Sequence, residues 1–510
     1  MIQSQSFWKT VTELCISCPK HLLTTTPLYI LGLALGAALL GIFFLVNMTR
    51  TSLPPYTPPT HPFLSLNSDI LIQLFHPQTY ILLILVAPIP RKPLPEEKRY
   101  RTLSKDGVIT KPQQLPCWLE ALELRRQRQR TAVNGNGNAD DERGSLQRKT
   151  SSESRNAGDT IDEAELYMSV VVPAYNEEER LGGMLEEAVD YLEHAYGTSL
   201  RWQQEEGGAV RRRKNMTRHS STNAHASSQT DGEEEDEEEK RKGWEIIIVS
   251  DGSKDKTEEV AFNFTRDHQL SLHPKGYAGP WTPGVHAGVH IPPGTIRVAR
   301  LSKNRGKGGA VTHGMRHVRG RYVVFADADG ASRFDDLGKL VNACRDVEDS
   351  AGRGVAVGSR AHMVGSEAVV NVCLLSYLTE MIENHLRMKL TTSKRSKIRN
   401  FLMHSFHLIL FLLTPRKTAT IKDTQCGFKL FSRASLPYII PYMHSEGWIF
   451  DVEMLMLAEF AGIPVAEVPV TWREVKGSKL NVMRDSIGMA WGLAVLRGAW
   501  SFGVFKRSIA

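Results

Sequence analysis

The stretch "MSVVVPAYNEEERL", residues 168–181, decides the fold class. It begins as a short run of β-branched apolar residues and then turns into acidic residues that favour a helix. The same design recurs in "WEIIIVSDGSKDKTEEVAF" from Trp244, "TIRVARLSKNRGKGGAVTHGMRHV" from Thr295 and "RYVVFADADGASRFDDLGKLVNAC" from Arg321, and "GVAVGSRAH" follows from Gly354. Continuous apolar strands alternating with helices predict an α/β fold with a mostly parallel sheet flanked by helices.

Polar side chains stand directly after each predicted strand. They are Asn176 and Glu177, Asp251 and Ser253, Arg305 and Lys307, and Asp327 and Asp329. Right-handed crossovers place the carboxyl ends of parallel strands on one edge of the sheet, where ligands bind. These residues are therefore predicted to form one site.

The segment "FADADG" places two carboxylates after an apolar run. Alternate residues of an extended segment point the same way, so Asp327 and Asp329 are expected to converge. Mg²⁺ or Mn²⁺ binds carboxylate oxygens and bridges them to a diphosphate, which would supply the missing counter-charge. The alternative is a turn whose aspartates cap the next helix.

The segment "NRGKGGA", residues 304–310, combines glycines with Arg305 and Lys307 at the start of a predicted helix. Such a loop suits a phosphate group, because its backbone N–H groups and its cations face the ligand. A simple tight turn is the alternative.

Six motifs in this order resemble the inverting glycosyltransferases of family 2, which have the GT-A fold. They are "VVVPAYNEEERL", "IIIVSDGSKDKT", "KNRGKGGAV", "FADADGASRF", "DTQCGFKLFSR" and "EGWIFDVEMLMLAEFAGIPVAEVPVTW". The resemblance covers roughly residues 165–480 and is strongest to the branch that glucosylates dolichyl phosphate. It implies UDP-glucose as donor, dolichyl phosphate as acceptor and dolichyl β-D-glucosyl phosphate as product. The product would serve N-glycan precursor assembly at the cytosolic face of the endoplasmic reticulum membrane.

The resemblance also implies roles for particular residues. Those expected at the nucleotide sugar are Pro173, Tyr175, Glu177, Asp251, Lys307 and Asp327, with Asp327 and Asp329 at the metal. Those expected at the acceptor phosphate are Arg360, Lys429 and Arg433, and those expected in catalysis are Asp329, Asp451 and Arg360. Ser250 in "SDGS" replaces an acid that the family has, and Asp451 could instead be a helix N-terminal acid that favours the dipole.

Two other functions compete with this reading. A dolichyl-phosphate mannosyltransferase that uses GDP-mannose would have the same fold and acceptor. A non-catalytic membrane scaffold could bind partners through its charged tracts, although it would not need three aspartates at one edge. The net charge of +7 comes from scattered residues without a basic, aromatic-lined face, so nucleic-acid binding is not predicted.

Composition, together with the resemblance, divides the chain into four parts. These are an N-terminal segment 1–50 with a signal-anchor helix at 28–46, a partly interfacial and disordered linker 51–165, a GT-A domain 166–480 with a disordered insertion 203–242, and an apolar helical tail 481–510. The linker is expected to be disordered over 127–163. Residues 47–80 lie between the anchor and the segment "PRKPLPEEKRY", which begins at Pro90 and in the family follows the anchor directly. The chain has N-x-T sequons at Asn47, Asn215 and Asn263, and the two in the domain, Asn215 and Asn263, are expected to stay unglycosylated if the domain is cytosolic.

Overall fold

The computed structural model describes residues 86–135, 161–197, 243–363, 410, 413–473, 475, 482–501 and 503–505. The predicted anchor at 28–46, the insertion 203–242 and the sequons at Asn47 and Asn215 lie outside these residues. Within the described ranges, no helix has the length and hydropathy needed to cross a membrane.

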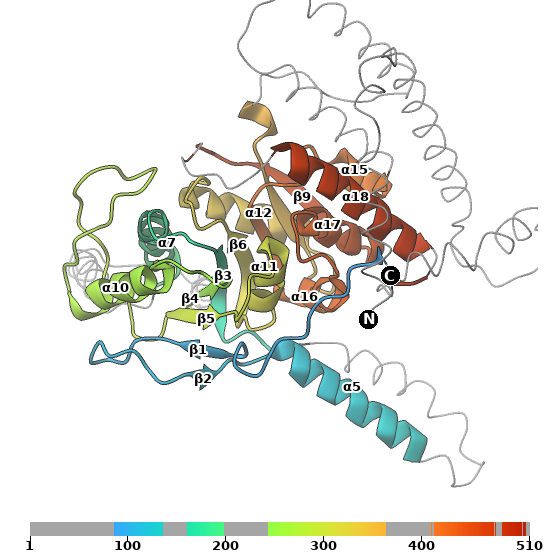
Figure 1. Cartoon of the computed structure of the whole chain (residues 1–510), viewed down its shortest axis with the longest axis horizontal. Helices are drawn as coiled ribbons and strands as arrows, with labels where there is room; N and C mark the ends of the chain where they lie inside the picture. The colour runs from blue at the N-terminus through green and yellow to red at the C-terminus, as the bar shows by residue number, and fades with distance from the viewer. Residues whose placement is uncertain are drawn as a thin grey trace, which may run out of the picture. The chain divides into compact units, whose positions relative to one another are not determined.

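The described residues form one sheet with helices around it (Figure 1). The strands are β1 (Arg99–Arg101), β2 (Gln113–Gln114), β3 (Leu166–Ala174), β4 (Trp244–Ser250), β5 (Ile296–Arg300), β6 (Gly320–Ala326), β7 (Val355–Ser359), β8 (Phe428–Ser432) and β9 (Val465–Pro469). The α-helices are α5 (Trp118–Gly135), α7 (Leu181–Tyr196), α10 (Thr257–Leu270), α11 (Lys307–Met315), α12 (Leu337–Val347), α15 (Arg416–Thr420), α16 (Leu436–Ile439), α17 (Phe450–Phe460) and α18 (Val482–Ser501). Short 3₁₀ helices are η1 (Phe334–Asp336), η2 (Ala361–Met363), η3 (Arg433–Ser435) and η4 (Ile440–Tyr442).

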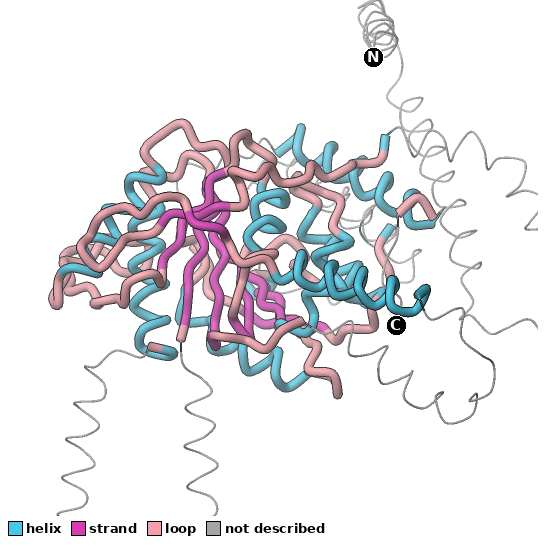
Figure 2. The backbone as a smooth tube through the Cα atoms, turned by 90° about the horizontal axis from the view of Figure 1, so that it is seen from below, coloured by secondary structure: helices cyan, strands magenta, loops and turns pink. Residues whose placement is uncertain are grey.

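The sheet order is β2-β1-β5-β4-β3-β6-β8-β7-β9. The run β5-β4-β3-β6 is parallel, as the sequence predicts. The prediction of a mostly parallel sheet holds only in part, because β8 enters antiparallel between β6 and β7. β1 also pairs antiparallel with β5, so the sheet is mixed. Figure 2 shows the strands as a central layer with helices on both sides.

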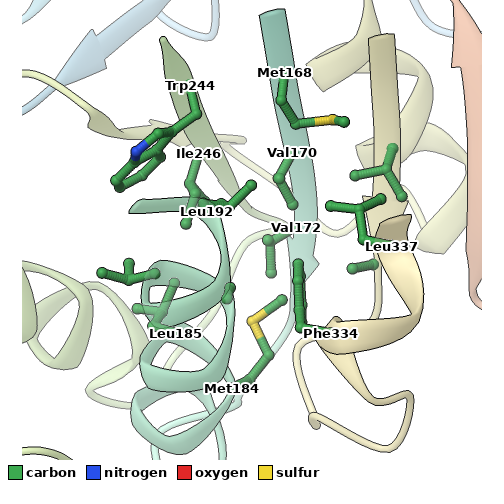
Figure 3. Packing of buried hydrophobic residues seen from close by; sticks show 14 of the residues in the cluster. Met168, Val170, Val172, Met184, Leu185, Leu192, Trp244, Ile246, Phe334 and Leu337 are labelled. Atoms are coloured by element: carbon green, nitrogen blue, oxygen red, sulfur yellow. The ribbon is translucent and has the colours of Figure 1, made fainter. Parts of the chain in front are cut away.

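Helix α7 is held to the sheet by its apolar side chains. Met184, Leu185 and Leu192 are spaced so that they fall on one face of the helix, and all three are fully buried. They pack against β3 residues that include Val170 and Val172 (Figure 3). Each such side chain contributes roughly 1.5–3 kcal/mol through burial. This packing fixes the turn between β3 and α7 relative to the sheet.

The segment before the first parallel strand is folded against the same sheet. β1 pairs with β5, and the Trp118 indole donates to the carbonyl of Met315 at 2.7 Å. Helix α5 runs to Gly135, so the expectation of disorder from residue 127 is wrong for its first nine positions. Arg and Gln are good helix formers and extend α5 into that tract. The rest of the tract up to residue 160 lies outside the described residues.

The predicted C-terminal tail contains a helix, α18. Leu493, Leu496 and Trp500 on it are buried, so this part of the tail packs on the folded domain.

Candidate active site

The edge at the carboxyl ends of the parallel strands gathers charged side chains from several segments. The turns after β3, β4, β5 and β6 all open there. Because β8 runs antiparallel with Phe428 opposite Ala326, the residues before β8 reach the same edge. The edge thus also receives "TQCG" from a distant part of the chain.

Lys307 and Asp327 form the centre of this edge. The Lys307 Nζ lies 2.7 Å from Asp327 Oδ1. Burial would lower the pKa of Lys307, but the charges of Asp327 and Asp451 outweigh it and the pKa is raised. Gly427 lies against Asp327 so closely that a Cβ atom there would overlap the carboxylate. The glycine of "QCGF" is therefore required by the aspartate of "FADADG".

Lys429 and Asp451 form a second, fully buried pair. The Lys429 Nζ is 2.5 Å from Asp451 Oδ1 and donates to the Cys426 carbonyl at 2.6 Å. Asp451 also lies in the first turn of α17, where a negative charge favours the helix dipole. Burial raises the pKa of Asp451 even though Lys429 and Lys307 oppose this effect. Lys429 has no exposed side-chain surface, so it meets Asp451 rather than the solvent side of the edge.

Asp329 is held by the turn that follows it and by an arginine. Its Oδ1 accepts the backbone N–H of Ala331 at 3.0 Å within the turn, and the N-cap of the next helix, η1, is Arg333 rather than an aspartate of this motif. Its Oδ2 lies 3.8 Å from Nη1 of Arg180. Burial, together with the charge of Asp327, raises the pKa of Asp329. A positive ligand at these two carboxylates would therefore be favoured.

Arg180 is a site residue that sequence reasoning missed. Its Nε and Nη2 each donate to the Glu177 carboxylate at 2.7 Å, which aims the guanidinium at Asp329. The signal was the single cation that ends "NEEER", but nothing local indicates that it reaches the turn after β6.

The turns after β3 and β4 are bound to each other. Asn176 has φ 54° and accepts the Lys254 N–H at 2.8 Å, and the Glu177 N–H donates to Thr257 Oγ1 at 2.7 Å. Pro173 pairs with Val249 inside the sheet. Tyr175 follows the end of β3 in the same turn, where it is partly buried. The predicted nucleotide residues of "PAYNE" therefore lie beside "SDGS".

Asp251 supports the loop after β5. Its two oxygens accept the N–H groups of Arg305 at 2.7 Å and Gly306 at 2.9 Å. Burial raises the pKa of Asp251 to about 6, although these bonds favour the ionised form. Asp251 was predicted at the nucleotide sugar, and its described hydrogen bonds go to the backbone of the "NRGKGGA" loop. Ser250 is buried and donates to Glu258 at 3.0 Å.

The "NRGKGGA" loop differs from the expected phosphate cradle. The Arg305 and Gly306 amides bind Asp251, and the Gly309 amide binds the Glu446 carbonyl at 3.1 Å. The Arg305 guanidinium binds the Glu446 carboxylate and, at 2.7 Å, the Arg91 carbonyl. These hydrogen bonds and this ion pair stabilise the loop itself. The loop in turn places Lys307 at the charged edge, next to Asp327.

Arg360 and Arg433, both predicted at the acceptor phosphate, lie at opposite edges. Arg360 follows β7 at the charged edge and donates from Nε and Nη2 to Asp423 at 2.7 and 2.9 Å. Burial opposes its charge, but Asp423 outweighs burial and raises the pKa of Arg360. Arg433 follows the end of β8, next to the start of β6, and donates to the carbonyls of Asp162 and Val318. Because β8 is antiparallel, the structure separates Arg433 from the other predicted residues.

Asp327 and Asp329 are the predicted metal ligands. Across the described ranges, no three His, Cys, Asp or Glu side chains are grouped to hold a metal by themselves. The two carboxylates are partly exposed, and the charge of Asp327 acts on Asp329. Their oxygens are of the hard type that Mg²⁺ and Mn²⁺ bind. The two carboxylates therefore fit a divalent cation, which would need further ligands besides them.

Comparison with known proteins identifies relatives of the chain. Residues 282–436 match the model of glycosyl transferase family 2. Dolichyl-phosphate beta-glucosyltransferase of Saccharomyces cerevisiae is 33% identical over 433 residues, which cover 84% of this chain and 91% of that protein. The human protein of the same name is 32% identical, covering 65% of this chain and 77% of that protein.

Solved structures are more distant. Glucosyl-3-phosphoglycerate synthase from Mycobacterium tuberculosis, crystallised with Mg²⁺ and UDP, is 15% identical with a TM-score of 0.35. The match covers 66% of this chain and 80% of that one. The same enzyme crystallised with Mn²⁺, UDP-glucose and phosphoglyceric acid gives a TM-score of 0.34 at 14% identity, with 66% and 80% coverage. At these scores the ligands of the M. tuberculosis enzyme say nothing about those of this chain.

The mixed α/β sheet is GT-A-like, and the identity to the yeast protein extends over nearly all of that protein. The chain therefore belongs to the dolichyl-phosphate β-glucosyltransferases, within glycosyl transferase family 2.

Proposed function

We propose that this protein transfers glucose from UDP-glucose to dolichyl phosphate with inversion and so makes dolichyl β-D-glucosyl phosphate. The observation that carries the proposal is the convergence of Asp327, Asp329, Lys307 and Arg360 on one edge of the sheet. Two anionic substrates need such an edge, because cations must hold their phosphates while carboxylates hold a metal. The names of the relatives support the choice of glucose and of dolichyl phosphate.

The donor diphosphate is placed at the Asp327–Asp329 turn. A divalent cation bound there by the two carboxylates would neutralise the charge that develops on the UDP leaving group. Lys307 is the protein's own cation at this point, and its raised pKa keeps it protonated at neutral pH. Arg180 lies on the other side of Asp329 and adds a second positive charge. These groups stabilise the departure of UDP.

The acceptor phosphate is assigned to Arg360. Asp423 occupies two of the three guanidinium nitrogens and fixes the plane of the group. Trp472 lies 5.5 Å from the guanidinium carbon and supports that plane. Lys429 was predicted to bind the same phosphate, but it is enclosed with Asp451. It is therefore proposed to position the edge rather than touch the acceptor.

The acceptor needs little help from a general base. A phosphate monoester carries more than one negative charge at pH 7, so an oxygen is already nucleophilic. Attack on the anomeric carbon from the face opposite UDP forms the new bond as the bond to UDP breaks, which inverts that carbon. The protein's role is to bind the anionic donor and the anionic acceptor together and to align the acceptor oxygen with the bond that breaks.

The proposed place of action is the cytosolic face of the endoplasmic reticulum membrane. UDP-glucose and a membrane-anchored acceptor would meet there if residues 28–46 anchor the chain as a single span. The domain would then face the cytosol.

Sugar transfer in detergent tests the proposal. Purified full-length chain is given short-chain dolichyl phosphate and Mg²⁺ with either UDP-glucose or GDP-mannose, and the lipid product is quantified. Glucose transfer that falls by more than 100-fold in Asp329→Ala is expected. Mannose transfer would overturn the donor. A folded chain that binds UDP but transfers neither sugar would point to the scaffold alternative.

A further inference from the structure

The segment between α10 and β5, residues 271–294, lies across helix α7, and we call it the strap. Two adjacent glutamates of α7 accept hydrogen bonds from its backbone. Glu186 Oε2 accepts the Tyr277 N–H at 2.9 Å, and Glu187 Oε1 accepts the Trp281 N–H at 2.7 Å. Both glutamates are buried. Figure 1 shows α7 and α10 side by side, and the strap leaves from the end of α10.

Two glycines in the first turn of α7 give the strap its path. A Cβ atom on Gly183 would lie 2.6 Å from the Ala278 carbonyl oxygen and 2.7 Å from Gly279 Cα. A Cβ atom on Gly182 would lie 2.9 Å from the Tyr277 ring. Each glycine costs a helix about 1 kcal/mol relative to alanine, so a pair of them needs a reason. Close contact with the strap backbone is that reason.

The tip of the strap contacts the turn that carries the metal-binding aspartates. The Trp281 Nε1 donates to the carbonyl of Gly330 at 3.0 Å, and Gly330 directly follows Asp329. Gly330 has φ +68°, and a Cβ atom on it would lie 3.3 Å from the Pro280 ring. The Arg473 guanidinium lies 5.3 Å from the Trp281 ring centroid and donates to the Pro280 carbonyl. The backbone of Trp281 is thus held by Glu187, and its indole ring is held by Arg473 and by the Gly330 carbonyl.

We propose that Trp281 is a positioning residue for the Asp327–Asp329 turn, acting through the Gly330 carbonyl. The turn ends in a left-handed glycine, which is the backbone position most easily rearranged. A displacement of about 1 Å at a reacting group can reduce a rate 100-fold, so an external hold on this turn affects the chemistry. The inference rests on the proposed function only in placing a diphosphate at the turn.

Amide hydrogen exchange of the ligand-free full-length protein tests the hold directly. In Trp281→Phe the ring remains but the indole N–H is lost. The peptide that contains the Ala331 and Arg333 amides, which bind Asp329 Oδ1 and the Thr471 carbonyl, should exchange at least tenfold faster. The strands β3 and β4 should exchange as in the unmodified protein. An unchanged rate in the turn would overturn the proposal.

Two further variants keep this test specific. Gly183→Ala raises the helix propensity of α7, but its methyl group displaces the strap. It should therefore increase amide exchange in the same turn although Trp281 itself is unchanged. Trp244→Phe is the matched control, because its indole donates to Glu193 at 2.8 Å from the first residue of β4, at the far end of the sheet. Faster exchange of the turn in Trp244→Phe, to the same extent, would contradict a local role for Trp281.

Kinetics separate this inference from the proposed function. With UDP-glucose and dolichyl phosphate, Trp281→Phe should lower kcat about tenfold and require more divalent cation for half-maximal rate. The KM for dolichyl phosphate should not change. If the unmodified chain transfers no glucose but the exchange result holds, the proposed function fails and the positioning role stands.

Discussion

The Lys307 ammonium group and the Asp327 carboxylate lie 2.7 Å apart, and each comes from a different strand–helix turn of the parallel sheet. The pair places a cation beside the carboxylates proposed to hold the metal. It is also enclosed enough that the loss of either partner leaves a charge in a poorly solvated place.

Replacing Lys307 by methionine should reduce kcat by about 100- to 1,000-fold, because a preorganised cation at the leaving group is lost. The matched control is Lys339→Met, since Lys339 pairs with Asp336 at the surface with 60% of its side chain exposed. The control should keep its rate within about twofold. Equal rate losses in the two variants would show that Lys307 has no special place in the reaction.

Replacing Gly427 by alanine should reduce kcat/KM roughly 100-fold, because the new methyl group must displace the Asp327 carboxylate. Gly488→Ala on α18 is the control, since nothing lies within 4 Å of a Cβ atom there. Steady-state rates, with circular dichroism to verify folding, measure the effect. Full activity in Gly427→Ala would mean that the position of Asp327 is not critical.

Glu97 should make the free energy of unfolding depend on pH in the acid range. Its carboxylate is buried, yet hydrogen bonds from Arg91, Leu94 and Ser302 outweigh burial and lower its pKa to about 2. A lowered pKa stabilises the fold above the ordinary value of 4.5, and that contribution is lost as the pH falls from 4.5 towards 2. Glu97→Gln should lower the free energy of unfolding by about 2 to 4 kcal/mol at pH 7.

Urea unfolding at a series of pH values measures this difference. The difference in unfolding free energy between the unmodified protein and Glu97→Gln should narrow steadily below pH 4.5, because Glu97 takes up a proton in the unfolded chain while it stays ionised in the folded one. Glu96→Gln, at an exposed neighbouring position, should show no gap. A gap that stays constant down to pH 2 would contradict the lowered pKa.

Asn263 offers a test of the proposed membrane orientation. It lies exposed on α10 within an N-x-T sequon. A cytosolic domain never meets the glycosylation machinery, so digestion with an N-glycosidase should cause no mass shift at this residue. The same chain behind a cleavable secretory signal serves as the positive control and should gain a glycan. A glycan at Asn263 in the unmodified chain would place the domain in the lumen.

The parallel strands and their polar ends could be predicted from the sequence because both are local patterns. An apolar run followed by Asp251 or Asp327 indicates where a strand stops and which edge it faces. The pairing direction of β8 is not local. The sequence of a five-residue strand does not indicate whether it pairs antiparallel, so Arg433 was predicted at the wrong edge of the sheet.

Contacts between residues of separate turns could not be predicted from the sequence either. Arg180 reaches Asp329, and Asp251 holds the backbone of Arg305, only because β3, β4, β5 and β6 are neighbours in space. The residue types indicated a charged site, but which acid meets which base depends on side-chain paths that packing decides.

The anomeric configuration of the product tests the central claim most directly. The purified full-length chain is incubated with UDP-glucose, in which the sugar is α-linked, and short-chain dolichyl phosphate, and the glycolipid is examined by nuclear magnetic resonance. A β-linked glucosyl phosphate is predicted, since one in-line displacement at the Asp327–Asp329 edge inverts the anomeric carbon. An α-linked product, or no glucolipid from a folded protein, would contradict the account.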